Sequence, residues 1–361
     1  MLKKLKKGFF LGLRSIEQGR TVLFSKDWRL RNQFERPRSI FFNRYWNNVA
    51  EGVGAEIDFV GYGFFRLRRD GKTTFVRQGE VMLDDHITLN IAGNKPLVHQ
   101  LLKEQGYLVP EYVEYDLSTL SKAKEFMRKC GGNFVVKPAS GAAGGWGITT
   151  KINSAVRLYH ASWKASAFSG KLIIERELPG KNYRLLYLNG EFVDAIRRDS
   201  PGVTGDGKST IKELIDKENA MRLNSKMPYA LSPLTVDLDC KYTLSDRGLS
   251  LNHIPADGER VEVKTTTNQY SRHENHSVLD EIHPSIVDYG RKISNAINVT
   301  FSGVDVMIED CTLPLKESGC IVNEINTTPG LHHHALVSDP EKEVPVGQKV
   351  IEYIFSSQAQ E

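Results

Sequence analysis

Two short apolar runs in the last third of the chain carry acidic and amide side chains in their middle. Residues 302–308 contain Asp305, and residues 321–327 contain Glu324 and Asn326. Both runs are rich in β-branched residues and are bounded by Gly or Pro, which is typical of buried strands. Side chains alternate along a strand, so Glu324 and Asn326 share a face and a neighbouring strand can set Asp305 beside them. This cluster of hard oxygen atoms favours Mg²⁺, which completes its shell with water and phosphates, and it predicts a nucleotide-phosphate enzyme.

A second group of residues, nearer the middle of the chain, suits phosphate binding. Lys137 ends the predicted strand 134–137, and residues 140–147 form a glycine-rich loop whose backbone N–H groups can approach phosphate oxygens. The loop lacks the Gly-Lys-Ser/Thr ending of a Walker A motif, so a flexible surface loop remains an alternative. Glu175 ends the apolar run 172–175, where it either accepts a hydrogen bond from a nucleotide or is a solvated carboxylate.

Composition sets the broad class of the protein. The chain has 361 residues, of which 25% are charged and 40% hydrophobic, and a net charge of +4, as expected of a globular protein with two or three domains. It contains neither a run of about 18 apolar residues nor a basic stripe with interleaved aromatics, so we expect no membrane span and no nucleic-acid partner. The four cysteines have no metal-binding spacing, which predicts reduced thiols and a cytoplasmic location. The basic start, residues 1–13, suggests an amphipathic or disordered segment rather than an export signal.

The elements that must position these residues alternate along the chain. Pro96 fits the start of a helix that follows Asn94, and Asn189-Gly190 is a type I′ hairpin signal between two strands. Glycines separate three short strands before residue 90, where several aromatic residues are expected to form a core. We expect strands at 57–60, 64–67, 73–77, 183–188 and 191–197, and helices at 210–222 and 284–296.

The order of these motifs resembles the ATP-grasp superfamily over about residues 86–355. Within it, the chain looks most like the ATP-grasp module of cyanophycin synthetase and next like that of bifunctional glutathione synthetases. The resemblance rests on the metal strands and on Ile-Ala-Gly-Asn-Lys-Pro-Leu at 91–97, Tyr-Arg-Leu-Leu at 183–186 and Gly-Asp-Gly-Lys-Ser-Thr-Ile-Lys-Glu-Leu-Ile at 205–215.

The resemblance implies an α/β (α+β) fold in which two α/β subdomains grip ATP. We expect a small N-terminal α/β domain at 1–90, the start of the ATP-grasp unit at 91–130, a lid subdomain at 131–181 and a central catalytic subdomain at 182–361. The implied activity is ATP-dependent ligation of a carboxylate to an amine, on an amino acid or peptide, through an acyl phosphate. ADP and phosphate are the expected by-products.

The resemblance also implies a role for each site residue. Glu324 is the expected bridge between two Mg²⁺ ions, with Mn²⁺ as a substitute, and Asn182 stands where the family often has a ribose-binding acid. Arg197 and Arg198 are adjacent and can exchange roles. The implied metal ligands are Asp305, Glu324 and Asn326; the nucleotide contacts are Lys95, Lys137, Ser140, Gly141, Gly144, Gly145, Glu175 and Asn182; the catalytic residues are Arg184, Arg198 and Lys208; the substrate contacts are Arg197, Tyr270, Arg272, His273, His276, Thr328, Gly330 and His332.

The sequence departs from the family on the substrate side. Residues 268–276 are bulky and polar where cyanophycin and glutathione synthetases have a short Ser-Thr-Gly-Gly segment, which predicts a different substrate. Consecutive histidines at 332–334 would alternate on an extended chain, so we expect substrate contact rather than a transition metal. Two other functions stay open: an ATP-binding module without turnover, and a kinase that stops at a phosphorylated product. A homodimer is possible.

Overall fold

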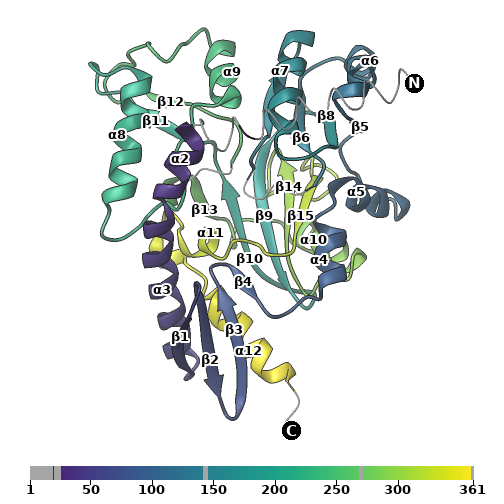
Figure 1. Cartoon of the computed structure of the whole chain (residues 1–361). Helices are drawn as coiled ribbons and strands as arrows, with labels where there is room; N and C mark the ends of the chain where they lie inside the picture. Colours follow the sequence, from purple (N-terminus) through teal and green to yellow (C-terminus); the bar gives the residue numbers. More distant parts are fainter. Residues whose placement is uncertain (1–18, 20–25, 141–144, 268–270, 359–361) are drawn as a thin grey trace.

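The structure, a computed structural model, describes residue 19 and residues 26–140, 145–267 and 271–358. At its centre is a five-stranded antiparallel sheet with the order β13-β10-β9-β14-β15 (Figure 1). The hairpin between β9 and β10 turns at Asn189 and Gly190, whose φ angles of 49° and 77° confirm the predicted type I′ geometry. The strands are β9 (Lys181–Leu188), β10 (Glu191–Arg198), β13 (Asn275–Ser277), β14 (Phe301–Ile308) and β15 (Ile321–Asn326).

One face of the central sheet is buried under helices. The helices α4 (His86–Ala92), α5 (Lys95–Glu104) and α10 (Pro284–Ala296) cover it, and Leu102 and Ile293 lie in the shared core. The side chain of Asn94 caps α5 by accepting a hydrogen bond from the backbone N–H of Leu97, as its position before Pro96 predicts. The helices leave the opposite face of the sheet available for the polar residues of the site.

A second antiparallel sheet, with the order β5-β8-β6-β7, forms the upper right part of the molecule in Figure 1. Its core packs strand residues such as Phe134 and Ile174 against two helices. The first strand of this sheet lies at 112–115, before the lid boundary expected at residue 131. The elements are β5 (Tyr112–Tyr115), η1 (Leu117–Thr119), α6 (Leu120–Cys130), β6 (Phe134–Pro138), β7 (Thr149–Ile152), α7 (Ala155–Ser166) and β8 (Leu172–Arg176).

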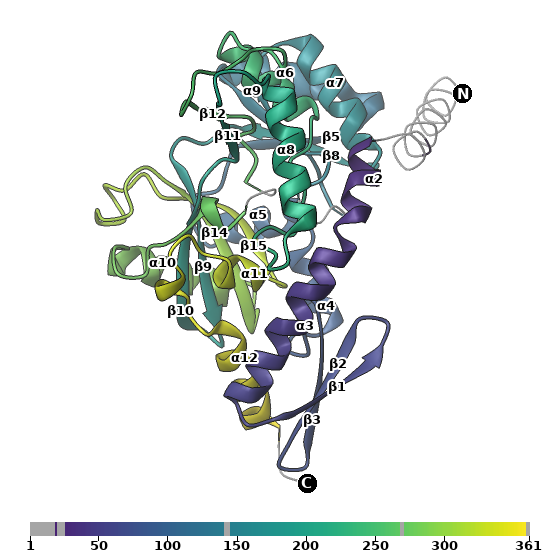
Figure 2. The same ribbon diagram turned by 90° about the vertical axis from the view of Figure 1, so that its left-hand side faces the viewer.

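The N-terminal elements pack on the central sheet instead of standing apart. The buried side chains of Phe42 and Trp46 share a core with Leu188 and Phe301 of the central sheet. The two N-terminal helices run along one side of the molecule, from the small sheet at the bottom toward the upper half (Figures 1 and 2). The elements are α2 (Lys26–Gln33), α3 (Glu35–Gly52), β1 (Glu56–Gly61), β2 (Phe64–Arg69), β3 (Lys72–Arg77), β4 (Glu80–Val81) and the C-terminal α12 (Val346–Ser357).

Residues between β10 and β13 build a further compact part with a hydrophobic core of its own, which includes Ile211, Leu244 and Val263. Its elements are β11 (Gly202–Thr204), α8 (Ile211–Asn224), α9 (Leu238–Asp246) and β12 (Arg260–Glu262). The short helices η2 (Arg272–Glu274), α11 (His332–Ala335) and η3 (Pro340–Lys342) complete the described chain. No helix among the described residues is long and apolar enough to cross a membrane.

Candidate active site

The polar residues of the two carboxyl-terminal strands meet on one face of the central sheet. Asp305 of β14 lies directly opposite Glu324 of β15 on one side and opposite Arg184 of β9 on the other. Asn326 is two residues from Glu324 and therefore shares its face. The strand alternation thus brings together the oxygen cluster that the sequence predicts. This row of residues lines a cleft of about 1240 Å³. Its other walls come from the sheet β5-β8-β6-β7, which we call the lid, and from the residues around α9.

Asp305 is held by two arginines at the bottom of the cleft. Arg184 donates from Nε to Oδ1 at 2.7 Å and from Nη2 to Oδ2 at 2.9 Å, and Arg198 donates from Nη2 to Oδ2 at 2.5 Å. Burial alone would raise the pKa of Asp305, but the two guanidinium charges outweigh it and lower that pKa to about 2. The carboxylate is therefore ionised, and it fixes both arginines beneath the cleft.

A lysine from outside the sheet reaches the second carboxylate. Lys95, at the start of α5, forms an ion pair with Glu324. Burial opposes ionisation of both groups, yet the charge of Lys95 lowers the pKa of Glu324, and the charge of Glu324 raises the pKa of Lys95. Lys137 of the lid adds to the lowering of the pKa of Glu324, so both lysines act on this end of the cleft.

The lid contributes a second ion pair. The Nζ atom of Lys137 lies 2.6 Å from Oε1 of Glu175, and both side chains are at most 5% exposed. Oε2 of Glu175 is buried and has no hydrogen-bond partner among the described residues, so it can still accept one. Asn182 lies nearby on β9, where its Oδ1 accepts a hydrogen bond of 2.7 Å from Nε of Arg198.

The donor chemistry of the cluster fits Mg²⁺. Asp305, Glu324 and Asn326 offer carboxylate and amide oxygens on one sheet face, as hard divalent cations prefer. The buried Nδ2 of Asn326 has no hydrogen-bond partner among the described residues. No group of three or more His, Cys, Asp or Glu residues in the described ranges could hold a metal ion, and the predicted set contains only two such residues.

The sequence suggested that the three consecutive histidines alternate along an extended chain, but the structure does not place them in one. They form the single helical turn α11 with Ala335. The rings of His332 and His333 lie 3.7 Å apart and line the cleft, whereas His334 turns away and its Nδ1 lies 2.7 Å from Oδ2 of Asp194. Burial, followed by the charge of Arg184, lowers the pKa of His332 to about 3, so this imidazole is neutral at physiological pH.

Several other predicted residues do not reach the cleft in this structure. Lys208 is exposed on the loop before α8, where Asp206 caps its backbone N–H at 3.0 Å. Arg197 follows the strand alternation to the face opposite Arg198 and pairs with Asp199 at 2.9 Å. His276 also contacts Asp199, at 3.1 Å. The remaining two, which do not line the cleft, are Arg272, a half-buried residue of η2, and His273, an exposed residue beside Tyr229.

The structure describes part of the glycine-rich loop 140–147 and the turn after β15. Gly145, Thr328 and Gly330 line the cleft, and Ser140 is exposed at the end of β6. A Cβ atom at Gly330 would lie 2.6 Å from Cε1 of His332, so a side chain at this position would displace the histidine rings. Gly141, Gly144 and Tyr270 lie outside the described residues.

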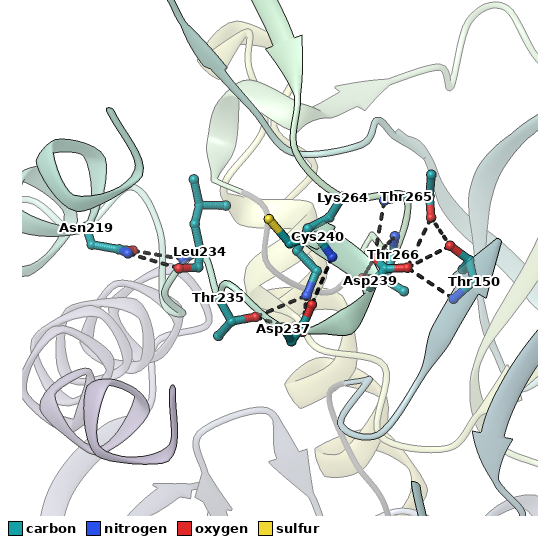
Figure 3. A network of polar contacts seen from close by, with 10 residues as sticks. All are labelled: Thr150, Asn219, Leu234, Thr235, Asp237, Asp239, Cys240, Lys264, Thr265 and Thr266. Carbon is teal, nitrogen blue, oxygen red and sulfur yellow. Dashed lines mark hydrogen bonds and ion pairs between the residues drawn. The ribbon is translucent and has the colours of Figure 1, made fainter. Parts of the chain in front are cut away.

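A threonine-rich wall of the cleft was not among the residues predicted from the sequence. Thr265, Thr266 and Thr267 line it together with Thr150 of β7. Three of these threonines, Thr150, Thr265 and Thr266, donate hydrogen bonds to Asp239 of α9 (Figure 3). The only signal in the sequence was the threonine run itself, because Asp239 lies 26 residues before it and 89 residues after Thr150.

The chain is similar in sequence to two kinds of curated synthetase. The chain is 28% identical over 297 residues to the glutathione biosynthesis bifunctional protein GshAB of Clostridium perfringens, which covers 81% of this chain and 38% of that protein. It is 30% identical over 256 residues to cyanophycin synthetase of Crocosphaera subtropica, which covers 70% of this chain and 29% of that protein. The chain therefore spans less than half the length of these curated relatives.

A solved structure shares the fold. The crystal structure of a bifunctional glutathione synthetase from Pasteurella multocida superposes with a TM-score of 0.52 at 22% identity, over 84% of this chain and 42% of that one. No protein-family model matches the sequence. The two sheets that face each other across the cleft, together with these relatives, show that the chain has an ATP-grasp fold.

Proposed function

We propose that the protein is an ATP-dependent carboxylate–amine ligase that forms an amide or peptide bond through an acyl phosphate and releases ADP and phosphate. The observation that carries this proposal is the row Arg184–Asp305–Glu324 on the floor of a cleft into which Lys95 and Lys137 also project. Phosphoryl transfer requires positive charge along the triphosphate and at the oxygens that gain negative charge, and this cleft concentrates such charge. Relatives whose names are glutathione and cyanophycin synthetases support the same reaction class.

In this proposal the lysines bind phosphate. Lys137 and Lys95 are paired with Glu175 and Glu324, so each is held near the cleft by a carboxylate that lies beside it. Glu175, with one buried carboxylate oxygen lacking a partner, accepts a hydrogen bond from the nucleotide, and the neighbouring Asn182 faces the ribose. Gly145 contributes backbone to the phosphate loop.

The arginines stabilise the negative charge that develops during transfer. Arg184 and Arg198 lie below the γ-phosphate position in this proposal, and Asp305 holds both in fixed orientations. Asp305, Glu324 and Asn326 would hold Mg²⁺, as one or two ions, with Mn²⁺ as a possible substitute. The ion would neutralise phosphate charge when bound.

The substrate side is proposed to be an amino acid or a short peptide. Thr328, Gly330 and His332 line the part of the cleft next to the arginines and would contact it. The neutral imidazole of His332, whose buried Nδ1 has no hydrogen-bond partner among the described residues, can accept a hydrogen bond from an amine. The four cysteines form no disulfide, and we place the reaction in the cytoplasm, where ATP is available.

A paired screen tests the proposal. The protein is incubated with ATP, Mg²⁺ and pairs drawn from amino acids and short peptides, and ADP, AMP and mass-shifted products are measured. We expect ADP only when a carboxylate and an amine are both present. AMP with pyrophosphate would refute the mechanism. A phosphorylated product formed without an amine would instead support a kinase, and tight ATP binding without any turnover would support a non-catalytic module.

A further inference from the structure

Asp239, near the start of α9, is fully buried and surrounded by hydrogen-bond donors. Its Oδ1 accepts from the hydroxyl and backbone N–H of Thr150, at 2.6 Å and 3.1 Å, and from the hydroxyl of Thr265 at 3.3 Å. Its Oδ2 accepts from the backbone N–H groups of Thr265 and Thr266, at 3.3 Å and 3.1 Å, and from the hydroxyl of Thr266 at 2.9 Å. Six donors around one carboxylate make a rigid junction (Figure 3).

The junction joins two walls of the cleft that are distant in sequence. Thr150 belongs to β7, the lid strand that follows the glycine-rich loop, and Thr265 and Thr266 belong to the wall that leads into residues 268–276. The hydroxyls of Thr150 and Thr265 also bond directly to each other. These hydrogen bonds form a direct connection between β7 and this wall.

The rest of α9 is also fastened to the lid. Arg157 of α7 donates to Asp246 at 2.6 Å, and its guanidinium lies 4.5 Å from the ring centre of Tyr242. On its other side α9 buries Cys240 and Leu244 in the separate core formed with β11, β12 and α8. The helix thus connects the lid to the part of the chain between β10 and β13.

The carboxyl group of Asp239 at this junction is ionised. Burial would raise the pKa of Asp239, but the charge of Lys264 and the hydrogen bonds from Thr150 and Thr266 outweigh it and lower that pKa. Lys264 is itself buried and is held by Asp237 and by Thr235 at 3.0 Å. An ionised carboxylate accepts stronger hydrogen bonds than a neutral acid does.

We propose that Asp239 is a positioning residue that couples the nucleotide lid to the Thr265–Thr266 wall, so that closure of the lid on ATP sets the wall that faces the second substrate. The coupling itself follows from the contacts around Asp239, whereas its consequence for the second substrate rests on the proposed ligase function. The proposed coupling requires little free energy, because the linked segments are already in contact and no new interface has to form.

Hydrogen exchange on the full chain tests the link without any nucleotide. Thr150→Val removes one hydroxyl on the lid side and keeps the shape of the residue. Because a hydrogen bond to a charged group contributes about 1.5–3 kcal/mol, we expect the amides of Thr265 and Thr266 to exchange about tenfold faster or more. Thr150→Ser keeps the hydroxyl and should restore slow exchange. Thr243→Val is the matched control, since the Thr243 hydroxyl is buried without a hydrogen-bond partner among the described residues.

A second arm adds the non-hydrolysable analogue AMPPNP with Mg²⁺. In the wild type we expect slower exchange both in β6–β7 and in residues 260–267. In Asp239→Asn we expect AMPPNP to slow exchange in β6–β7 but not in residues 260–267. The proposal is wrong if Thr150→Val leaves the exchange of residues 265–266 unchanged, or if Asp239→Asn keeps the nucleotide-dependent protection of both segments. If AMPPNP protects neither segment of the wild type, the proposed nucleotide function fails, and the nucleotide-free comparison still decides the link.

Discussion

Asp305 and Glu324 lie directly opposite each other on the antiparallel strands β14 and β15, and each is bound by cations from a different part of the chain. Asp305 holds two arginines of the sheet, whereas Glu324 pairs with Lys95 at the start of α5. Two carboxylates that face each other directly across strands repel one another unless cations separate their charges. Substitution of a single charged residue therefore tests what this cleft does.

Glu324→Gln should slow ADP formation by at least about 100-fold, because it removes a proposed metal ligand and the partner of Lys95. The fold should persist, since Glu324 lies on a surface opened for substrate and not in the apolar core. Initial rates of ADP release, with circular dichroism as a check of folding, measure this. The exposed Glu309→Gln at the end of β14 is the control. Near-normal turnover of Glu324→Gln would refute the metal assignment.

Lys137→Met should separate stability from nucleotide binding. It leaves Glu175 buried without its ion-pair partner, which should lower the free energy of unfolding by about 3–5 kcal/mol. The double variant with Glu175→Gln should recover most of that stability, because no unpaired charge remains buried. Both variants should bind AMPPNP at least about tenfold more weakly, since each lacks the phosphate contact. Calorimetric affinity equal to wild type in the double variant would remove Lys137 from the phosphate site.

Asp305 predicts an acid dependence of stability. Its pKa near 2 in the folded protein lies below the value of about 3.9 in an unfolded chain. The ionised group therefore stabilises the fold above about pH 4, and this contribution is lost as the pH falls toward 2. From pH 5 to pH 3 the wild type should lose about 1 kcal/mol from this residue alone. Urea unfolding of Asp305→Asn should lack this part of the slope, whereas the exposed Asp257→Asn should keep it; equal slopes in all three proteins would contradict the buried ion pair.

His332 predicts a dependence at higher pH. Its folded-state pKa of about 3 lies below the value of about 6.5 in an unfolded chain, so the unfolded protein takes up the proton first. The stabilisation is complete above about pH 6.5 and declines as the pH falls toward 3. Between pH 7 and pH 5, the unfolding free energy of His332→Gln should fall by roughly 1 kcal/mol less than that of the wild type, after allowance for partial exposure. His273→Gln, at an exposed position, is the control. If His332→Gln flattens the pH dependence no more than His273→Gln does, His332 is exposed to solvent in the folded protein.

The sequence predicted the floor of the cleft because strand alternation is a local property. Period-two spacing sets Glu324 and Asn326 on one face, and the antiparallel register then brings Asp305 opposite Glu324. The same alternation decides between neighbouring arginines: Arg198 faces the cleft, whereas Arg197 faces the other side of the sheet. The type I′ turn at Asn189 and Gly190 was likewise predictable, since it depends on two residues only.

The junction at Asp239 could not be predicted, because it depends on the packing of segments far apart along the chain. Lys208 shows a second limit of prediction from sequence, because a matching motif does not fix where its side chain lies. Its motif resembles the family, yet in this structure Asp206 and Ser209 use the motif to build the entry of α8, and the lysine side chain points to solvent. The helical turn at His332 was missed because a four-residue helix has too little periodicity to recognise.

The most direct test of the acyl-phosphate mechanism follows one oxygen atom. A carboxylate substrate found by the paired screen is labelled with ¹⁸O in both oxygens and is converted with ATP, Mg²⁺ and the amine, and the released phosphate is analysed by mass spectrometry. If the carboxylate attacks the γ-phosphorus and the amine then displaces phosphate, each phosphate released carries one ¹⁸O atom. Unlabelled phosphate, or AMP in place of ADP, would contradict the mechanism.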